Sequence, residues 1–106
     1  MRTIIFLTSR NGAYDAKALF EDGKITIQPG ARIRLDFADH IRGGRKALSY
    51  RKNPEYVNEK GVVLKECVFT SASTAAQFVT GRSTNGLDVW KVEKKLTLKQ
   101  WLEQNM

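Results

Sequence analysis

The stretch FTSASTAAQFVTGRSTNGLDVW, residues 69–90, decides the fold of the second half of this chain. Its first part predicts a short helix over residues 72–80. Ser71 is a good N-cap, the residues that follow give one apolar face, and Gly81 can end the helix in the left-handed conformation. A helix this short is stable only when it packs on other elements, so we expect its apolar face to be buried.

The second part of the stretch predicts a turn and a strand. Residues 85–86 are Asn-Gly, a pair that readily adopts the positive backbone angles of a tight turn. The turn leads into an expected strand over residues 87–92, in which Trp90 is most simply a core anchor. Further on, Thr97 and Gln100 have the spacing of a capping box, which predicts a docked C-terminal helix.

The first third of the chain is typical of strands joined by tight turns. Its opening residues form a nearly continuous apolar run with β-branched members, which favours a strand in a small sheet. A later Asp-Gly pair predicts a hairpin turn. The expected segments are a strand over 2–8, a turn at 11–12, a strand over 14–20, a hairpin turn at 22–23, a strand over 25–27 broken at 29–30, and a segment of period two over 32–37 whose polar face carries arginines.

The middle of the chain carries weaker helix signals. Residues 45–52 can form a short helix. Asn53 and Pro54 resemble an N-cap followed by proline at the first helical position, and Gly61 would close that second helix. We then expect a strand over residues 62–69. Cys67 lies within it and is expected to be a small, partly buried apolar residue.

Length and composition favour one domain over residues 1–106. The predicted elements give it an α+β fold, in which a small antiparallel sheet of hairpins packs with short helices and a C-terminal helix. Residues 1–37 form its strand-rich part and residues 38–106 its helix-containing part. The apolar run within the first residues is too short for a signal peptide or a membrane span, which indicates a cytoplasmic protein. A single cysteine and a single histidine, His40, argue against a disulfide, a structural metal or another cofactor.

The charge balance is the strongest compositional signal. Eighteen Lys and Arg against eleven Asp and Glu give a formal charge of +7 and a pI near 9.8. Such a surface attracts polyanions, whether nucleic acid, an acidic protein or an anionic membrane face. The alternative is that the charge serves only solubility.

The distribution of charge suggests where a polyanion would bind. No acidic residue interrupts the basic stretch from His40 to Pro54, in which Tyr50 is a candidate stacking group. The alternatives are a solvated helix face for the basic stretch and simple capping for the serines. The candidate nucleic-acid-binding residues fall into two groups. Arg42, Arg45, Lys46, Arg51, Lys52 and Arg82 are expected to neutralise phosphates. Ser71 and Ser73, at the start of the predicted helix with its free backbone amides, and Asn85, on the loop that follows the helix, are expected to add hydrogen bonds.

A family resemblance is carried by the quoted stretch and by the later Leu-Thr-Leu at residues 96–98. The matching residues are Phe69, Thr70, Ser71, Ser73, Ala75, Ala76, Gly81, Asn85, Gly86 and Trp90. They resemble the core of a small domain of unknown function that is attached to restriction-modification adenine methylases and to nucleases of the GIY-YIG type. They are also similar to the related restriction-enzyme and adenine-methylase-associated domain. Ala72 departs from the pattern, because the family usually has proline there.

The resemblance implies an accessory module associated with DNA modification or defence. The residues themselves give no support for an enzyme: the glycine spacing of residues 81–86 is that of a phosphate-binding loop, but Leu87 stands where the motif needs lysine. Two functions stay open. One is a non-catalytic module that binds nucleic acid, DNA rather than RNA, beside a methylase or nuclease partner. The other is a protein-interaction or homodimerisation module without nucleic-acid contact. Neither function involves a membrane.

Overall fold

The protein is a mixed α+β fold built on one six-stranded antiparallel sheet, as the sequence predicts. A computed structural model describes residues 1–38, 41, 44–93 and 95–105. The strand order across the sheet is β4-β3-β2-β1-β5-β6. The strands are β1 (Arg2–Thr8), β2 (Asp15–Glu21), β3 (Lys24–Ile27), β4 (Cys67–Phe69), β5 (Lys91–Glu93) and β6 (Leu96–Thr97), and the helices are α1 (Arg45–Lys52), α2 (Ala72–Thr80), α3 (Gly86–Val89) and α4 (Leu98–Gln104).

The first three strands form the meander that the sequence predicts. β1 pairs with β2 along its whole length, and β2 pairs with β3 through a tight turn in which Asp22 and Gly23 have φ of 50° and 85°. Such positive angles at both turn positions match the twist of the flanking strands. Alternate residues of β1 point to opposite faces, so that Ile5 and Leu7 are buried while Ile4 and Phe6 are exposed.

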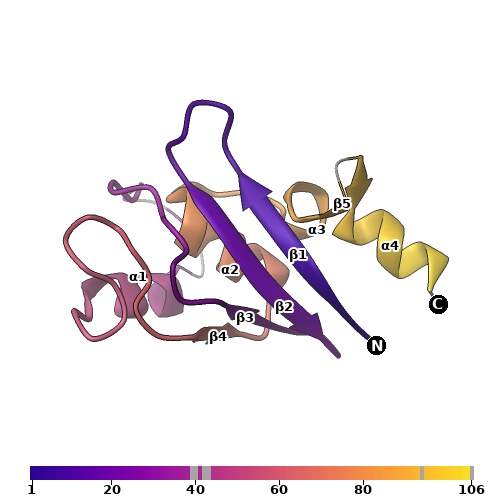
Figure 1. Ribbon diagram of the computed structural model, residues 1–106, viewed down its shortest axis with the longest axis horizontal. Coiled ribbons are helices and arrows are strands. Elements are labelled where there is room, and N and C mark those ends of the chain that lie inside the picture. Colours follow the sequence, from indigo (N-terminus) through magenta and orange to yellow (C-terminus); the bar gives the residue numbers. More distant parts are fainter. Residues whose placement is uncertain (39–40, 42–43, 94, 106) are drawn as a thin grey trace.

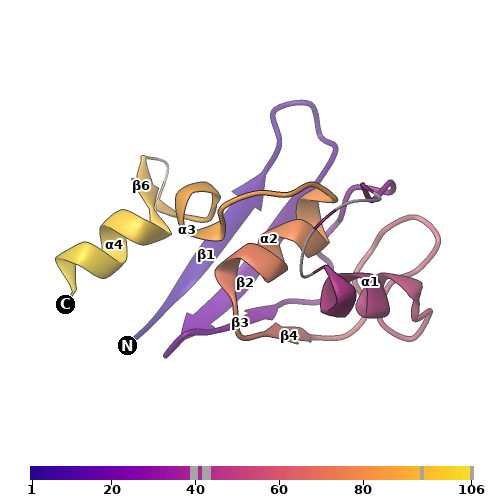
Figure 2. The ribbon, with the colours of Figure 1, turned by 180° about the vertical axis from the view of Figure 1, so that it is seen from behind.

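The helices are gathered on one face of this sheet, and the other face is open. Figure 1 shows α2 behind β2, with α1 to one side of it and α4 beyond β1 at the opposite end of the molecule, and Figure 2 shows the same helices from the other side, in front of the sheet. Residues 75–80 of α2 are all buried, and the largest buried side chains of the core are those of Trp90, Phe69 and Phe78. One layer of helices on a sheet therefore leaves the outer sheet surface in contact with solvent.

α2 begins and ends where the sequence places its caps. The side chain of Ser71 accepts a hydrogen bond from the Thr74 amide at 3.3 Å. Gly81 ends the helix in the left-handed conformation with φ of 70°, and a Cβ there would overlap the carbonyl oxygen of Asp36. The capping box of α4 also forms, because Thr97 and Gln100 exchange hydrogen bonds of 2.9 and 3.1 Å.

The predicted turn and strand at residues 85–92 are wrong. Asn85 is the N-cap of α3, and the strand that follows is shortened to β5. Gly86 does not adopt a positive backbone angle; its backbone lies so close to that of Ala72 that a Cβ would overlap the Ala72 carbonyl. Trp90 is fully buried, as predicted, and its Nε1 donates to the same carbonyl at 3.1 Å.

Two further predictions in the middle of the chain are wrong. Residues 32–37 form only isolated bridges at Arg32, to Asp15 and to Val62, and Leu35 is 71% exposed instead of buried. The backbone amides of this segment donate in turn to the start of β2, to the loop at Gly61 and to the end of α2, which breaks the alternation of a strand. No helix follows Asn53, which caps the C-terminal end of α1 and forms an Asx turn with the amide of Glu55.

The strand predicted over residues 62–69 is only partly formed. Val62 and Val63 take part in isolated bridges, and the ladder itself is limited to β4. Among the described residues, no helix is long and apolar enough to cross a membrane.

Candidate nucleic-acid interface

The start of α2 is covered by α3. Ser71 uses its hydroxyl as the N-cap, the hydroxyl of Ser73 accepts from the amide of Gly86 at 3.0 Å, and Asn85 accepts from the amide of Leu87 at 3.1 Å. The three predicted ligand-binding side chains at this end of the helix are therefore brought together, but each is engaged within the protein. Gly86 lies so close to the first turn of α2 that a Cβ there would overlap the backbone of Ala72 and Ser73.

Three arginines lie at the opposite end of α2. They come from different elements and cover carbonyl groups that have no partner within the helix. Arg51 Nε, Arg34 Nε and Arg82 Nη1 donate to the carbonyl oxygens of Phe78, Thr80 and Gly81 at 3.0, 2.8 and 2.9 Å, respectively. Because α2 has no basic residue in its last turn, these guanidinium groups also supply the positive charge that a helix C-terminus favours.

Asp36 is the acidic partner of this arginine cluster. Arg82 Nη2 lies 2.7 Å from Asp36 Oδ2, and this hydrogen bond lowers the pKa of the Asp36 carboxyl group. Arg51 is mostly buried, and the loss of solvent around its guanidinium lowers its pKa to about 10. Arg51 is still charged at neutral pH, so the cluster has more positive than negative charge.

A basic groove with aromatic walls lies along α1. Its volume is about 650 Å³. The rings of Tyr50 and Tyr56 meet edge to face with centroids 5.0 Å apart, and Lys46 Nζ lies 5.9 Å from the centroid of the Tyr50 ring. The lining residues of this groove, here called the α1 groove, are Arg45, Lys46, Ser49, Tyr50, Asn53 and Tyr56.

The aromatic wall of the α1 groove is held firmly by the sheet. The hydroxyl of Tyr50 accepts from the amide of Val68 at 3.1 Å and donates to its carbonyl oxygen at 3.4 Å. At the other side, Lys65 Nζ lies 5.9 Å from the centroid of the Tyr56 ring and 3.6 Å from a carboxylate oxygen of Glu55. The groove thus combines two cationic side chains, from Arg45 and Lys46, with two tyrosine rings, and Lys65 lies near the Tyr56 ring without lining the groove.

The structure brings together only part of the predicted site. Arg45 and Lys46 line the α1 groove, and Arg45 also lines a second hollow together with Lys52 and Phe37. Arg42 and His40 lie outside the described residues. Arg34, Tyr56 and Lys65 are not among the predicted site residues, although the period of two over residues 32–37 predicts that Arg34 lies on a polar face open to solvent or to a ligand.

The comparison with known families matches nearly the whole chain. The model of a domain of unknown function, DUF4357, covers residues 5–102. The chain belongs to this family. The membership confirms the resemblance to a small domain of unknown function and carries no information about methylases or nucleases. No curated protein and no solved structure matches the chain.

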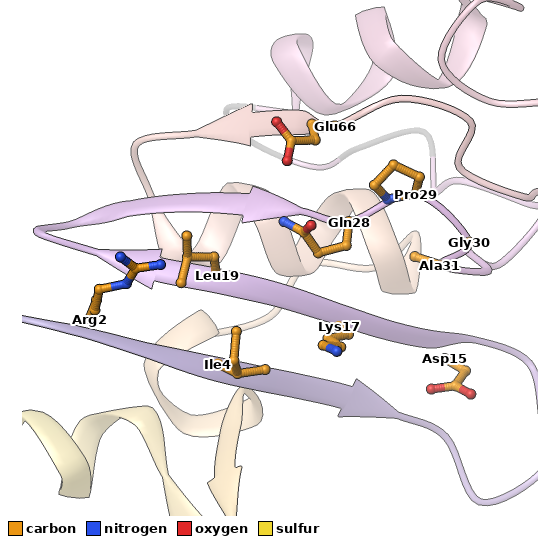
Figure 3. A pocket seen from close by; sticks show the side chains of 10 residues that line it. All are labelled: Arg2, Ile4, Asp15, Lys17, Leu19, Gln28, Pro29, Gly30, Ala31 and Glu66. Carbon is orange, nitrogen blue, oxygen red and sulfur yellow. The ribbon is translucent and has the colours of Figure 1, made fainter.

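This DUF4357 domain also has an open sheet face. Ile4 and Phe6 of β1 are 38% and 42% exposed on it. A shallow hollow of about 690 Å³ lies on the same face, and Figure 3 shows Ile4 of β1 beside Lys17 and Leu19 of β2. The face is mixed in character, because Arg2, Lys17, Asp15 and Glu66 also line the hollow.

The lone cysteine of the DUF4357 domain is a core residue. The Cys67 side chain is fully buried, and burial raises the pKa of its thiol to about 12. Among the described residues, no group of three or more metal-ligating side chains is present. Cys67 has the position of a packing residue and not of a reactive nucleophile.

We expect Cys67 to react with Ellman's reagent at about pH 8 at least roughly a hundredfold more slowly in the folded protein than in urea. The thiol stays protonated when folded, and the stability it contributes is lost only as pH rises from 9.0 toward 12. Stopped-flow labelling measures both rates. Equal rates would show that the thiol is accessible in the folded state.

Proposed function

We propose that this domain is a non-catalytic accessory module that binds nucleic acid, DNA in preference to RNA, in the setting of DNA modification or defence. A methylase or nuclease is the protein partner that this setting implies. The observation that carries the proposal is the α1 groove, in which Arg45 and Lys46 line the same hollow as two tyrosine rings. Lys and Arg neutralise phosphates, and tyrosine rings offer flat surfaces for unpaired bases.

The placement of the charges on α1 supports a role in binding. Arg45 and Lys46 occupy the first turn of α1, where no acidic residue is present and no side chain caps the helix. Cations at this end of a helix oppose its dipole and cost a few tenths of a kcal/mol or more each. Because these residues reduce the stability of the helix locally, a function in ligand binding explains them better than folding does.

Fluorescence anisotropy with labelled DNA over a salt series tests this proposal. We expect log Kd to rise linearly with log salt, by roughly 0.9 for each phosphate that is neutralised. The double variant Arg45→Glu with Lys46→Glu should weaken binding by more than about tenfold and should reduce the slope, because two phosphate contacts become repulsive. Repeating the series with single-stranded DNA, duplex DNA and RNA establishes the preferred polymer.

The matched control is the double variant Lys95→Glu with Lys99→Glu. It changes the net charge by the same amount, but Lys99 is on α4 and Lys95 directly precedes β6, and both elements lie at the far end of the molecule from α1 (Figure 2). Its affinity should fall by less than about threefold through the long-range field alone. Equal losses in both double variants would contradict a binding surface on α1, and the absence of salt-dependent binding would reject the proposal.

The open sheet face supports a second candidate function, that of a protein-interaction or dimerisation module. Ile4, Phe6 and Leu19 lie on a surface that no described helix covers, and apolar side chains on such a face mark contact sites between proteins. This function predicts self-association or partner binding that persists at high salt. The same salt series therefore separates the two candidates.

A further inference from the structure

Charge on the open sheet face is arranged evenly about the middle of β2. Leu19 lies at this point and is opposite Ile4 of β1 in the ladder. Lys17 and Glu21 are each two residues from Leu19, so both point to the open face, about 7 Å from Leu19 in opposite directions. A base and an acid are thus equally spaced on the two sides of an apolar pair.

The same spacing recurs on β1. Phe6 and Arg2 are each two residues from Ile4, and Figure 3 shows Arg2 and Lys17 on opposite sides of Ile4. Arg2 Nη1 lies 3.9 Å from Glu21 Oε2 within the chain, and these side chains are 68% and 42% exposed. A contact this long and this exposed leaves both charged groups accessible to a partner.

The open face is close to electrically neutral, unlike the chain as a whole. The charged residues that line its larger hollow are two bases, Arg2 and Lys17, and two acids, Asp15 and Glu66. The whole chain has a formal charge of +7. A polyanion gains little at a neutral surface, whereas two copies of a basic protein can approach each other there without strong repulsion.

We propose that the open sheet face binds a second copy of this chain, with a two-fold axis that crosses the strands at Ile4 and Leu19. Rotation about this axis places Lys17 of each copy opposite Glu21 of the other, because the two residues are equally far from the axis. The apolar pair of each copy packs against the same pair of the other, in two sheets stacked about 10 Å apart.

The same rotation places Phe6 of each copy opposite Arg2 of the other, as a cation–π contact requires. One patch supplies both halves of every contact, which is the condition for an isologous interface. The proposal rests on the second candidate function and names its partner, and it makes no use of the α1 groove. Only part of one sheet face is buried, so we expect a dissociation constant on the order of 10–100 µM.

Sedimentation velocity of the full chain without nucleic acid, over roughly a hundredfold range of concentration around this value, tests the proposal. We expect a change from monomer to dimer that persists at high salt, because the centre of the interface is apolar. Lys17→Glu and Glu21→Lys should each weaken dimerisation at least about tenfold, because each places like charges opposite one another twice in the dimer. The two substitutions change the net charge in opposite directions, so a loss in both is not an effect of net charge.

The decisive variant combines Lys17→Glu with Glu21→Lys. It should dimerise more tightly than either single variant and within about fivefold of the unchanged chain, because both ion pairs form again with their signs exchanged. Lys99→Glu is the matched control, because it reverses one charge on α4 and should leave the dissociation constant within about twofold. Circular dichroism shows whether each variant is folded.

Two results would overturn the proposal. A chain that stays monomeric over the whole range would exclude a second copy, although the open face would still be accessible to a different protein, as the second candidate function requires. A dimer that Lys17→Glu does not weaken, or that the combined variant does not restore, would exclude the two-fold arrangement. Neither result bears on DNA binding in the α1 groove, which the anisotropy series measures separately.

Discussion

Gly86→Ala is expected to lower the free energy of unfolding by at least roughly 3 kcal/mol, which is a large part of the total for a domain of this size. The added Cβ would overlap the carbonyl group of Ala72 and the amide of Ser73. Both are backbone groups within α2, so no side-chain rotation relieves the overlap. α3 would have to move away from α2, which would also disturb the adjoining Trp90. Urea unfolding followed by circular dichroism measures the loss.

The control is Gly12→Ala in the turn between β1 and β2. Gly12 has a positive φ of 77°, but a Cβ there meets nothing within 4 Å. This substitution should cost only about 1 kcal/mol, the strain of a left-handed alanine. Similar losses at the two glycines would mean that the contact between α2 and α3 is looser than described.

Trp90→Ala is expected to cost about 3–5 kcal/mol, the range for removal of a large buried aromatic side chain. Trp90 is fully buried, and its indole N–H donates a hydrogen bond to the carbonyl oxygen of Ala72. The alanine variant therefore loses apolar burial and leaves a backbone acceptor without its partner. Thermal and urea unfolding, followed by circular dichroism, give the difference.

Two companion variants separate these contributions. Trp90→Phe keeps much of the apolar area but not the donor, so its loss should lie nearer 1–3 kcal/mol. Trp101→Ala removes a half-buried ring that packs edge to face on Phe20, with centroids 6.1 Å apart, and should cost less than Trp90→Ala. An equal or larger loss at Trp101 would contradict the assignment of Trp90 as the anchor of the core.

The elements that the sequence predicts correctly are those with local causes. The turn at Asp22 and Gly23 needs positive backbone angles, and the ends of α2 are set by Ser71 and Gly81. The capping box at Thr97 is equally local. In each case neighbouring residues alone determine the conformation, so tertiary contacts do not need to be known.

The errors arise where packing between distant segments decides the conformation. Asn-Gly at residues 85–86 is compatible with a turn or with a helix start, and the close approach of Gly86 to Ala72 selects the helix. The alternating pattern around Leu35 failed because the backbone there pairs with loops and with the end of α2. Such contacts leave no periodic signal in the sequence.

The candidate site was predictable only in part for the same reason. The basic stretch containing Arg45 and Lys46 is visible in the sequence, but the sequence does not show that Arg51 turns inward to cover the end of α2. Tyr56 reaches the α1 groove through an irregular loop, and Lys65 lies near its ring. Ser73 is not part of the proposed interface, although it was predicted to be, because its hydroxyl accepts a hydrogen bond from the amide of Gly86.

The most direct test of the account is a map of the DNA-binding surface by ¹H–¹⁵N NMR on the full chain titrated with a short oligonucleotide. The proposed interface predicts the largest shifts at residues 45–56 and at Lys65, with few changes in α4 or on the open sheet face. Shifts centred on Ile4, Phe6 and Leu19, or on α4, would contradict a nucleic-acid interface on α1.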